Sequence, residues 1–173
     1  MARQVRILGI DPGSRLTGFG VLDFTGDKAS YVASGSIAST KGEFAERLKI
    51  IFRSVSEIVS EYEPDIVAIE SVFVHKNAGS ALKLGHARSA AICATFEHDV
   101  EVFEYAPRQI KQAIVGTGGA SKEQVQHMVI TMLNLQGEPA PDAADALATA
   151  LCHGHRRGFA ERLAENAAMV ARR

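Results

Sequence analysis

The sequence predicts a single α/β domain in which a mixed five-stranded sheet carries helices on both faces. Three strand patterns with short connections occupy residues 5–37. Two further strand patterns, over residues 65–70 and 100–105, are each preceded by a helical pattern. Short connections favour antiparallel neighbours, whereas a strand-helix-strand crossover makes two strands parallel. We therefore expect three antiparallel strands followed by two parallel strands.

The first three strands form an antiparallel meander. Residues 5–10 are a mainly apolar run, which is typical of a buried strand. Residues 17–24 alternate apolar with small or polar side chains, as a half-buried strand does, and residues 31–37 follow a turn at residues 25–27. The connections are short enough for hairpins.

Helices fill the rest of the chain. Apolar residues recur every three or four positions over residues 44–62, which predicts an amphipathic helix that Pro64 ends. A second helix is expected over residues 80–96, and its many small side chains would allow close packing on the sheet or against a second copy. Pro107 opens a third helix.

Two further helices close the pattern. Ser121 and Gln124 form a capping box for the fourth helix, and a last core helix starts at Asp142. This order of elements is compatible with a ribonuclease H-like fold, in which the first strand is central and the fourth pairs beside it. We expect one domain over residues 1–155 and a C-terminal tail over residues 156–173 that is either helical or disordered.

Composition limits the classes of protein to which this chain can belong. Of 173 residues, 46% are hydrophobic and 23% are charged, as in a soluble globular protein of one domain. The N-terminal apolar run is too short for a signal peptide, and no stretch approaches the roughly 20 apolar residues of a membrane helix, so we expect a cytoplasmic location. Cys93 and Cys152 lack metal-ligand spacing and are predicted to be reduced core residues.

Four acidic residues stand where a buried element meets a turn. Asp11 follows the first strand, Glu70 closes the fourth, and Asp142 and Asp145 share one face of the last helix. Two unit charges about 4 Å apart repel by roughly 4 kcal/mol at an effective dielectric of about 20. If the four converge, they must protonate or bind a cation, and oxygen-only ligands favour Mg²⁺ or Mn²⁺.

Each acidic residue also has a structural explanation. Asp11 could hydrogen-bond the backbone of the turn that follows it. Asp142 is a natural N-cap, and Asp145 lies in a first turn, where the helix dipole favours negative charge. Glu70 is harder to explain in this way because glutamate is depleted in strands.

Basic residues gather in two stretches that contain no Asp or Glu, residues 71–96 and 105–122. The net charge of −1 argues against a nucleic-acid partner, but these stretches argue for one. The alternative is that they simply solvate exposed helix faces. The basic side chains predicted to bind DNA are Lys76, Lys83, Arg108, Lys111 and Lys122.

Six motifs in register resemble those of the bacterial RuvC family of Holliday junction resolvases, over roughly residues 5–153. They occupy residues 9–14 with 17–20, 69–73, 76–78 with 80–85, 103–108, 124–128 and 142–148. The resemblance implies a ribonuclease H-like homodimer that nicks two opposed strands of a four-way DNA junction in recombination and repair. It also implies Mg²⁺ or Mn²⁺ as cofactor, with two ions per active site, and the branch-migration proteins RuvA and RuvB as partners.

The resemblance also assigns roles to residues. The family's acidic tetrad falls on Asp11, Glu70, Asp142 and Asp145, although some relatives place histidine at the position of Asp142. Lys111 and Lys122 would approach the DNA backbone and position phosphate rather than read bases. Phe73 would wedge against junction bases, whereas without the resemblance it would be a core residue at the end of the sheet.

Two other functions fit part of the pattern. An actin-like ATPase also has an Asp-x-Gly turn after its first strand, but it repeats its fold in two domains that 173 residues cannot hold. A non-catalytic junction-binding module would need neither metal nor an intact acidic tetrad.

Overall fold

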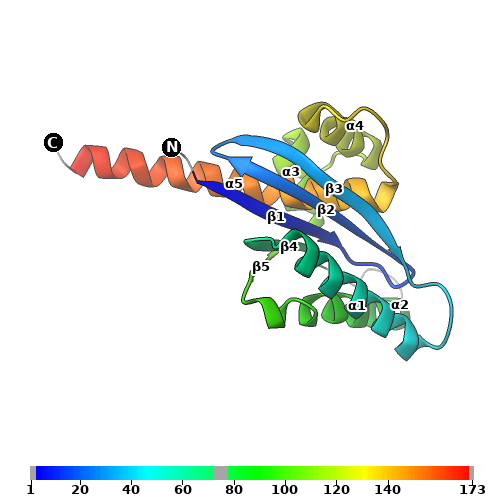
Figure 1. Cartoon of the computed structure of the whole chain (residues 1–173). Helices are drawn as coiled ribbons and strands as arrows, with labels where there is room; N and C mark the ends of the chain where they lie inside the picture. The colour runs from blue at the N-terminus through cyan, green and yellow to red at the C-terminus, as the bar shows by residue number, and fades with distance from the viewer. Residues whose placement is uncertain (1–2, 72–77, 172–173) are drawn as a thin grey trace.

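Five strands form one mixed sheet in the order β3-β2-β1-β4-β5 (Figure 1). The computed structural model describes residues 3–71 and 78–171. The strands are β1 (Gln4–Asp11), β2 (Leu16–Thr25), β3 (Lys28–Ala38), β4 (Ile66–Glu70) and β5 (Glu101–Tyr105). The helices are α1 (Phe44–Tyr62), α2 (Ala78–Cys93), the short 3₁₀ helix η1 (Phe96–His98), α3 (Pro107–Val115), α4 (Lys122–Leu133) and α5 (Pro141–Ala171).

Strand pairing follows the expected plan. β1 pairs antiparallel with β2, and β2 with β3, whereas β4 runs parallel to β1 and β5 parallel to β4. β1 is therefore the central strand. The predicted fold class, a ribonuclease H-like mixed sheet of three antiparallel and two parallel strands, is confirmed at this level.

Helices cover both faces of the sheet, with α3, α4 and α5 on one side and α1 and α2 on the other (Figure 1). Because successive strand residues point to opposite faces, β1 contributes to two separate cores. Ile7 packs with the buried residues of α3, α4 and α5, whereas Leu8 packs with those of α1 and α2. Both side chains are at most 1% exposed.

Helix α5 lies against the sheet with almost no space between the two backbones. A Cβ atom at Gly9 of β1 would come within 3 Å of the Ala146 carbonyl oxygen, and one at Gly18 of β2 would come within 3 Å of the Asp142 carbonyl oxygen. Any larger residue at these positions would push the helix away. The two glycines therefore fix where the start of α5 meets the strand ends.

Three boundaries differ from the expectation. Helix α2 ends at Cys93, before the short helix η1, and α5 begins at Pro141, so that Asp142 lies inside the first turn rather than at the N-cap. Of the two alternatives for the tail, the structure shows the helical one: α5 continues without a break past residue 155 to Ala171, instead of ending there, and projects beyond the sheet (Figure 1).

The prediction that both cysteines belong to the core is wrong for Cys93. Cys152 is fully buried, but Cys93 is exposed. Helix α2 buries Ala87 and Ala91, one turn apart, against the α1 side of the sheet, and Cys93 points away from that stripe. Separately, none of the described helices is long and apolar enough to cross a membrane.

Candidate active site

Asp11 and Glu70 end two adjacent parallel strands at the same edge of the sheet. Ile10 pairs with Ile69, so the next residue of each strand, Asp11 or Glu70, reaches the same level. The two carboxyl groups are close enough to share a hydrogen bond when one of them is protonated. Parallel pairing thus turns two acidic residues 59 positions apart in the sequence into neighbours.

The turn after Asp11 is fixed by a buried threonine. Thr17 Oγ1 donates to the Gly13 carbonyl oxygen at 2.9 Å and accepts from the Gly13 backbone N–H at 3.3 Å. Thr17 is completely buried. This closed turn is the reason that β2 can return beside β1 while the Asp11 side chain stays at the strand end.

The start of α5 brings the other two carboxylates to this edge. Asp142 sits over Gly18 of β2, and Asp145 lies nearly one turn further along the same helix face. Lys122 Nζ of α4 forms an ion pair with Asp145 Oδ2 at 2.6 Å. All four acidic side chains are half-buried, so each keeps part of its surface open to the solvent side of the site.

Burial and mutual repulsion disfavour full ionisation of this group. Burial raises the pKa of Asp11 to about 8, and the charges of Glu70, Asp145 and Asp142 and the hydrogen bond from Glu70 add to the effect. Burial also raises the pKa of Glu70 and of Asp145. The dependence of one pKa on three other carboxylates shows that all four share one electrostatic environment.

Two lysines face the same carboxylates. Lys111 of α3 and Lys122 of α4 line a pocket of about 200 Å³ together with Glu70 and Asp145. Both lysines oppose the rise in the pKa of Glu70 and of Asp145. The ion pair with Asp145 in turn raises the pKa of Lys122. Lys111 and Lys122 are therefore placed to neutralise negative charge at this edge.

A larger cleft, about 1100 Å³ in volume, opens beside the small pocket. Asp11 and Glu70 line it, and so do Arg108 of α3 and Arg156 of α5. Glu70 belongs to both hollows. The cleft therefore joins the carboxylates to residues of α3 and to two arginines, whose positive charge favours an anionic ligand.

The structure brings some of the predicted DNA-binding residues to this cleft and not others. Arg108 lines the cleft and Lys111 lines the adjoining pocket, whereas Lys83 is exposed on α2 next to Leu84, which lines the cleft. Phe73 and Lys76 lie outside the described residues.

Arg156 was missed by sequence reasoning. It stands at the start of a segment without a recognisable motif, although the pair of basic residues at 156 and 157 directly follows the buried part of the last helix.

The donor set suits a hard divalent cation. Carboxylate oxygens are the ligands that Mg²⁺ and Mn²⁺ prefer, and a cation would remove the repulsion that raises the pKa of Asp11. Among the described residues, no three His, Cys, Asp or Glu side chains are gathered closely enough to enclose an ion. Asp145 is instead turned to Lys122 and Asp11 to Glu70, so metal binding must reorient these side chains.

A β3-β2-β1-β4-β5 sheet with carboxylates on its two central parallel strands and on a helix packed against them defines a ribonuclease H-like nuclease. Comparison with known proteins identifies the family. The family described as crossover junction endodeoxyribonuclease RuvC matches residues 7–153, and the chain belongs to it.

Relatives support this assignment over nearly the whole chain. Crossover junction endodeoxyribonuclease RuvC of Enterobacter sp. (strain 638) is 53% identical over 166 residues, which is 96% of each chain. That of Pseudomonas fluorescens (strain SBW25) is 58% identical over 151 residues, or 87% of each.

One solved structure agrees with the family assignment, and a second shares the fold. The structure of T. thermophilus RuvC in complex with Holliday junction substrate matches with a TM-score of 0.85 and 36% identity, covering 90% of this chain and 96% of that one. The yeast mitochondrial Holliday junction resolvase Ydc2 matches with a TM-score of 0.64 and 11% identity, covering 87% and 79%, and shows the shared fold alone.

Proposed function

We propose that this chain resolves four-way DNA junctions by paired symmetric nicks, hydrolysing phosphodiester bonds to leave 5′-phosphate and 3′-hydroxyl ends. The observation that carries the proposal is the convergence of Asp11, Glu70, Asp142 and Asp145 at one sheet edge in a chain of the RuvC family. The T. thermophilus relative, bound to a Holliday junction, spans almost the same length of chain and supports the choice of substrate.

The four carboxylates are the proposed ligands of Mg²⁺, for which Mn²⁺ should substitute, with two ions per active site. Asp11, on the central strand, would hold the ions together with Glu70 and Asp145, and Asp142 would complete or orient the shell. Two bound metal ions would supply the activation of a water for in-line attack and the stabilisation of the leaving 3′ oxygen. No protein nucleophile is needed for this reaction.

The remaining side chains prepare the site for phosphate. Lys122 neutralises Asp145 in the structure and can turn to a DNA phosphate once a metal takes over that carboxylate. Lys111, in the same pocket, lowers the cost of bringing phosphate beside Glu70. Arg108 would hold the strand further along the cleft. Phe73, Lys76 and Lys83 remain predicted DNA contacts.

The substrate symmetry favours a dimer. A four-way junction has two-fold symmetry, and two opposed nicks require two sites related by the same axis. Helix α2 is a suitable dimer contact because its small residues are not all used inside the subunit: Ala87 and Ala91 are buried, but Ser89 is exposed and nothing lies within 4 Å of a Cβ placed at Gly85. RuvA and RuvB are the proposed partners of this dimer.

Cleavage of a labelled synthetic junction tests the proposal. With Mg²⁺ the protein should cut two opposed strands at symmetric positions, leave a linear duplex of the same sequence intact, and lose activity in EDTA. Junction binding without nicks in Mg²⁺ or Mn²⁺ would instead support the non-catalytic binding module. ATP hydrolysis without junction cleavage would revive the actin-like alternative, which the family assignment otherwise leaves without support.

A further inference from the structure

Arg156 of α5 lines the same cleft as the carboxylates Asp11 and Glu70. Arg156 is 11 residues beyond Asp145 on one continuous helix, so the two positions are about 16 Å apart along the helix axis at about 1.5 Å per residue.

Aromatic side chains hold Arg156 in place. Its guanidinium lies 5.6 Å from the centre of the Tyr105 ring, in a cation–π contact. Tyr105 is only 7% exposed, and its hydroxyl group is hydrogen-bonded to His153 Nδ1 at 2.8 Å. The Phe103 ring packs against the His153 ring with centroids 4.5 Å apart. Arg156 therefore rests on a platform built from β5 and α5.

His153 belongs to the platform but does not compete with Arg156 for an anion. It precedes Arg156 by three positions and so lies on the same face of α5. Burial and the nearby charges of Arg157 and Arg156 lower the pKa of His153 to about 4. The imidazole is therefore neutral at physiological pH, and it is the guanidinium of Arg156 that brings positive charge to the lining of the cleft.

The hydrogen-bond donors of Arg156 are free for a ligand. A guanidinium that contacts an aromatic ring keeps its planar fork of N–H groups available, in the geometry that matches phosphate. Other arginines of the protein are neutralised: Arg6 pairs with Asp23, Arg88 with Glu104 and Arg162 with Asp27. Arg156 is exposed, and among the side chains that the structure describes none is paired with it as a carboxylate partner.

We propose that Arg156 binds a backbone phosphate of the junction strand that enters the active site, about five nucleotides from the scissile bond. The spacing follows from the 16 Å along α5 and a rise of about 3.4 Å per nucleotide. Helix α5 then supplies carboxylates near its start and a phosphate anchor three turns later. This inference rests on the proposed junction-cleaving function.

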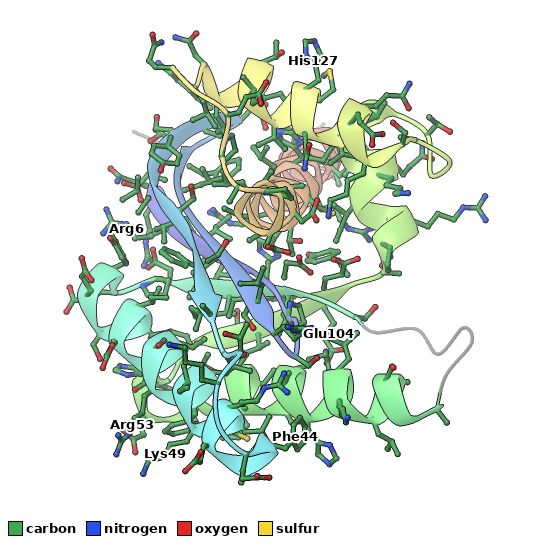
Figure 2. All side chains as sticks on the ribbon, turned by 90° about the vertical axis from the view of Figure 1, so that its right-hand side faces the viewer. Arg6, Phe44, Lys49, Arg53, Glu104 and His127 are labelled. Carbon is green, nitrogen blue, oxygen red and sulfur yellow. The ribbon has the colours of Figure 1, made fainter. Side chains whose placement is uncertain are left out.

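Junction affinity of charge variants provides the first test. Arg156→Gln should weaken binding of a fluorescent four-way junction in EDTA about three- to tenfold and reduce the salt dependence by about one unit of slope. Arg53→Gln is the matched control, because Arg53 is an exposed residue of α1 on the other side of the sheet (Figure 2), and it should change affinity less than twofold. Arg156→Lys should fall between the two because it keeps only the charge.

Neutral phosphates locate the contact. A series of junctions, each with one methylphosphonate at a successive position from the cut site, should reveal a position near the fifth nucleotide where wild-type protein loses affinity and Arg156→Gln does not. Equal affinity of the Arg156→Gln and Arg53→Gln variants, or equal losses for wild type and Arg156→Gln at every position, would overturn the inference. Failure of wild-type protein to bind any junction would overturn the proposed function itself.

Discussion

Replacing Asp11 with asparagine should make the stability of the metal-free protein less sensitive to pH. In the folded chain the pKa of Asp11 is raised from 3.8 to about 8 by burial and by the neighbouring carboxylates. Between these values the folded state holds a proton that the unfolded state has released. The free energy of unfolding of the wild-type protein therefore falls as pH rises through this window.

The size of the effect follows from the same shift. One pKa unit corresponds to about 1.4 kcal/mol. Between pH 5.5 and 8 the wild-type protein should therefore lose up to about 3 kcal/mol of its free energy of unfolding. That is a large fraction of a typical stability of about 5–15 kcal/mol. Asparagine carries no titrating group, and its amide can donate to Glu70 as the protonated carboxyl does, so Asp11→Asn should lose about 3 kcal/mol less than wild type over this range.

Urea unfolding in EDTA, followed by circular dichroism at pH 5.5 and pH 9, measures the difference. Asp99→Asn is a suitable control because Asp99 is exposed and has a left-handed backbone, with φ of 49°, that asparagine also adopts. The control should follow wild type. If wild type and Asp11→Asn lost the same stability between the two pH values, the electrostatic account of the site would be refuted.

Three further substitutions test the packing and charge of the site. Gly18→Ala should cost on the order of 1–3 kcal/mol of stability by urea unfolding and strongly reduce junction cleavage, because a Cβ there meets the Asp142 backbone. Gly137→Ala is the control and should be nearly neutral, because nothing lies within 4 Å of a Cβ at that position. Equal effects of the two substitutions would contradict the close approach of α5 to the sheet. Leu147→Ala removes a fully buried side chain and should cost about 2–5 kcal/mol in the same assay, and a loss below 1 kcal/mol would argue against this core. Lys122→Ala should weaken junction binding and lower its salt slope by up to about one unit, and an unchanged slope would show that Lys122 does not contact phosphate.

The parts of the fold that were predictable are those with a local signal. The apolar runs of β1 and β4 and the capping box at Ser121 each specify an element directly, and the ladder Ile10–Ile69 then places Asp11 beside Glu70. The extent of α5 could not be predicted because its last part lacks an apolar stripe. The exposure of Cys93 depends on which face of α2 meets α1, and small residues on several sides of that helix leave this open.

In the active site, too, the predictable residues are those with a local sequence signal. Its carboxylates were recognisable because each ends or begins an element that the sequence pattern marks. Arg156 was not recognisable, since its platform joins Tyr105 and His153, residues 48 positions apart that meet only when α5 packs beside β5. Lys111 and Lys122 were predicted to contact phosphate, but the ion pair between Lys122 and Asp145 emerges only from the packing of α4 on α5. Neither contact has a signature in the local sequence.

The central claim is that the four carboxylates form the centre that cuts DNA. The most direct test compares wild type and Asp11→Asn for binding and for cleavage of the same four-way junction in Mg²⁺. We predict that Asp11→Asn binds the junction with an affinity within about threefold of wild type and produces no paired nicks. Cleavage by Asp11→Asn at the wild-type rate would place the reaction elsewhere and contradict the account.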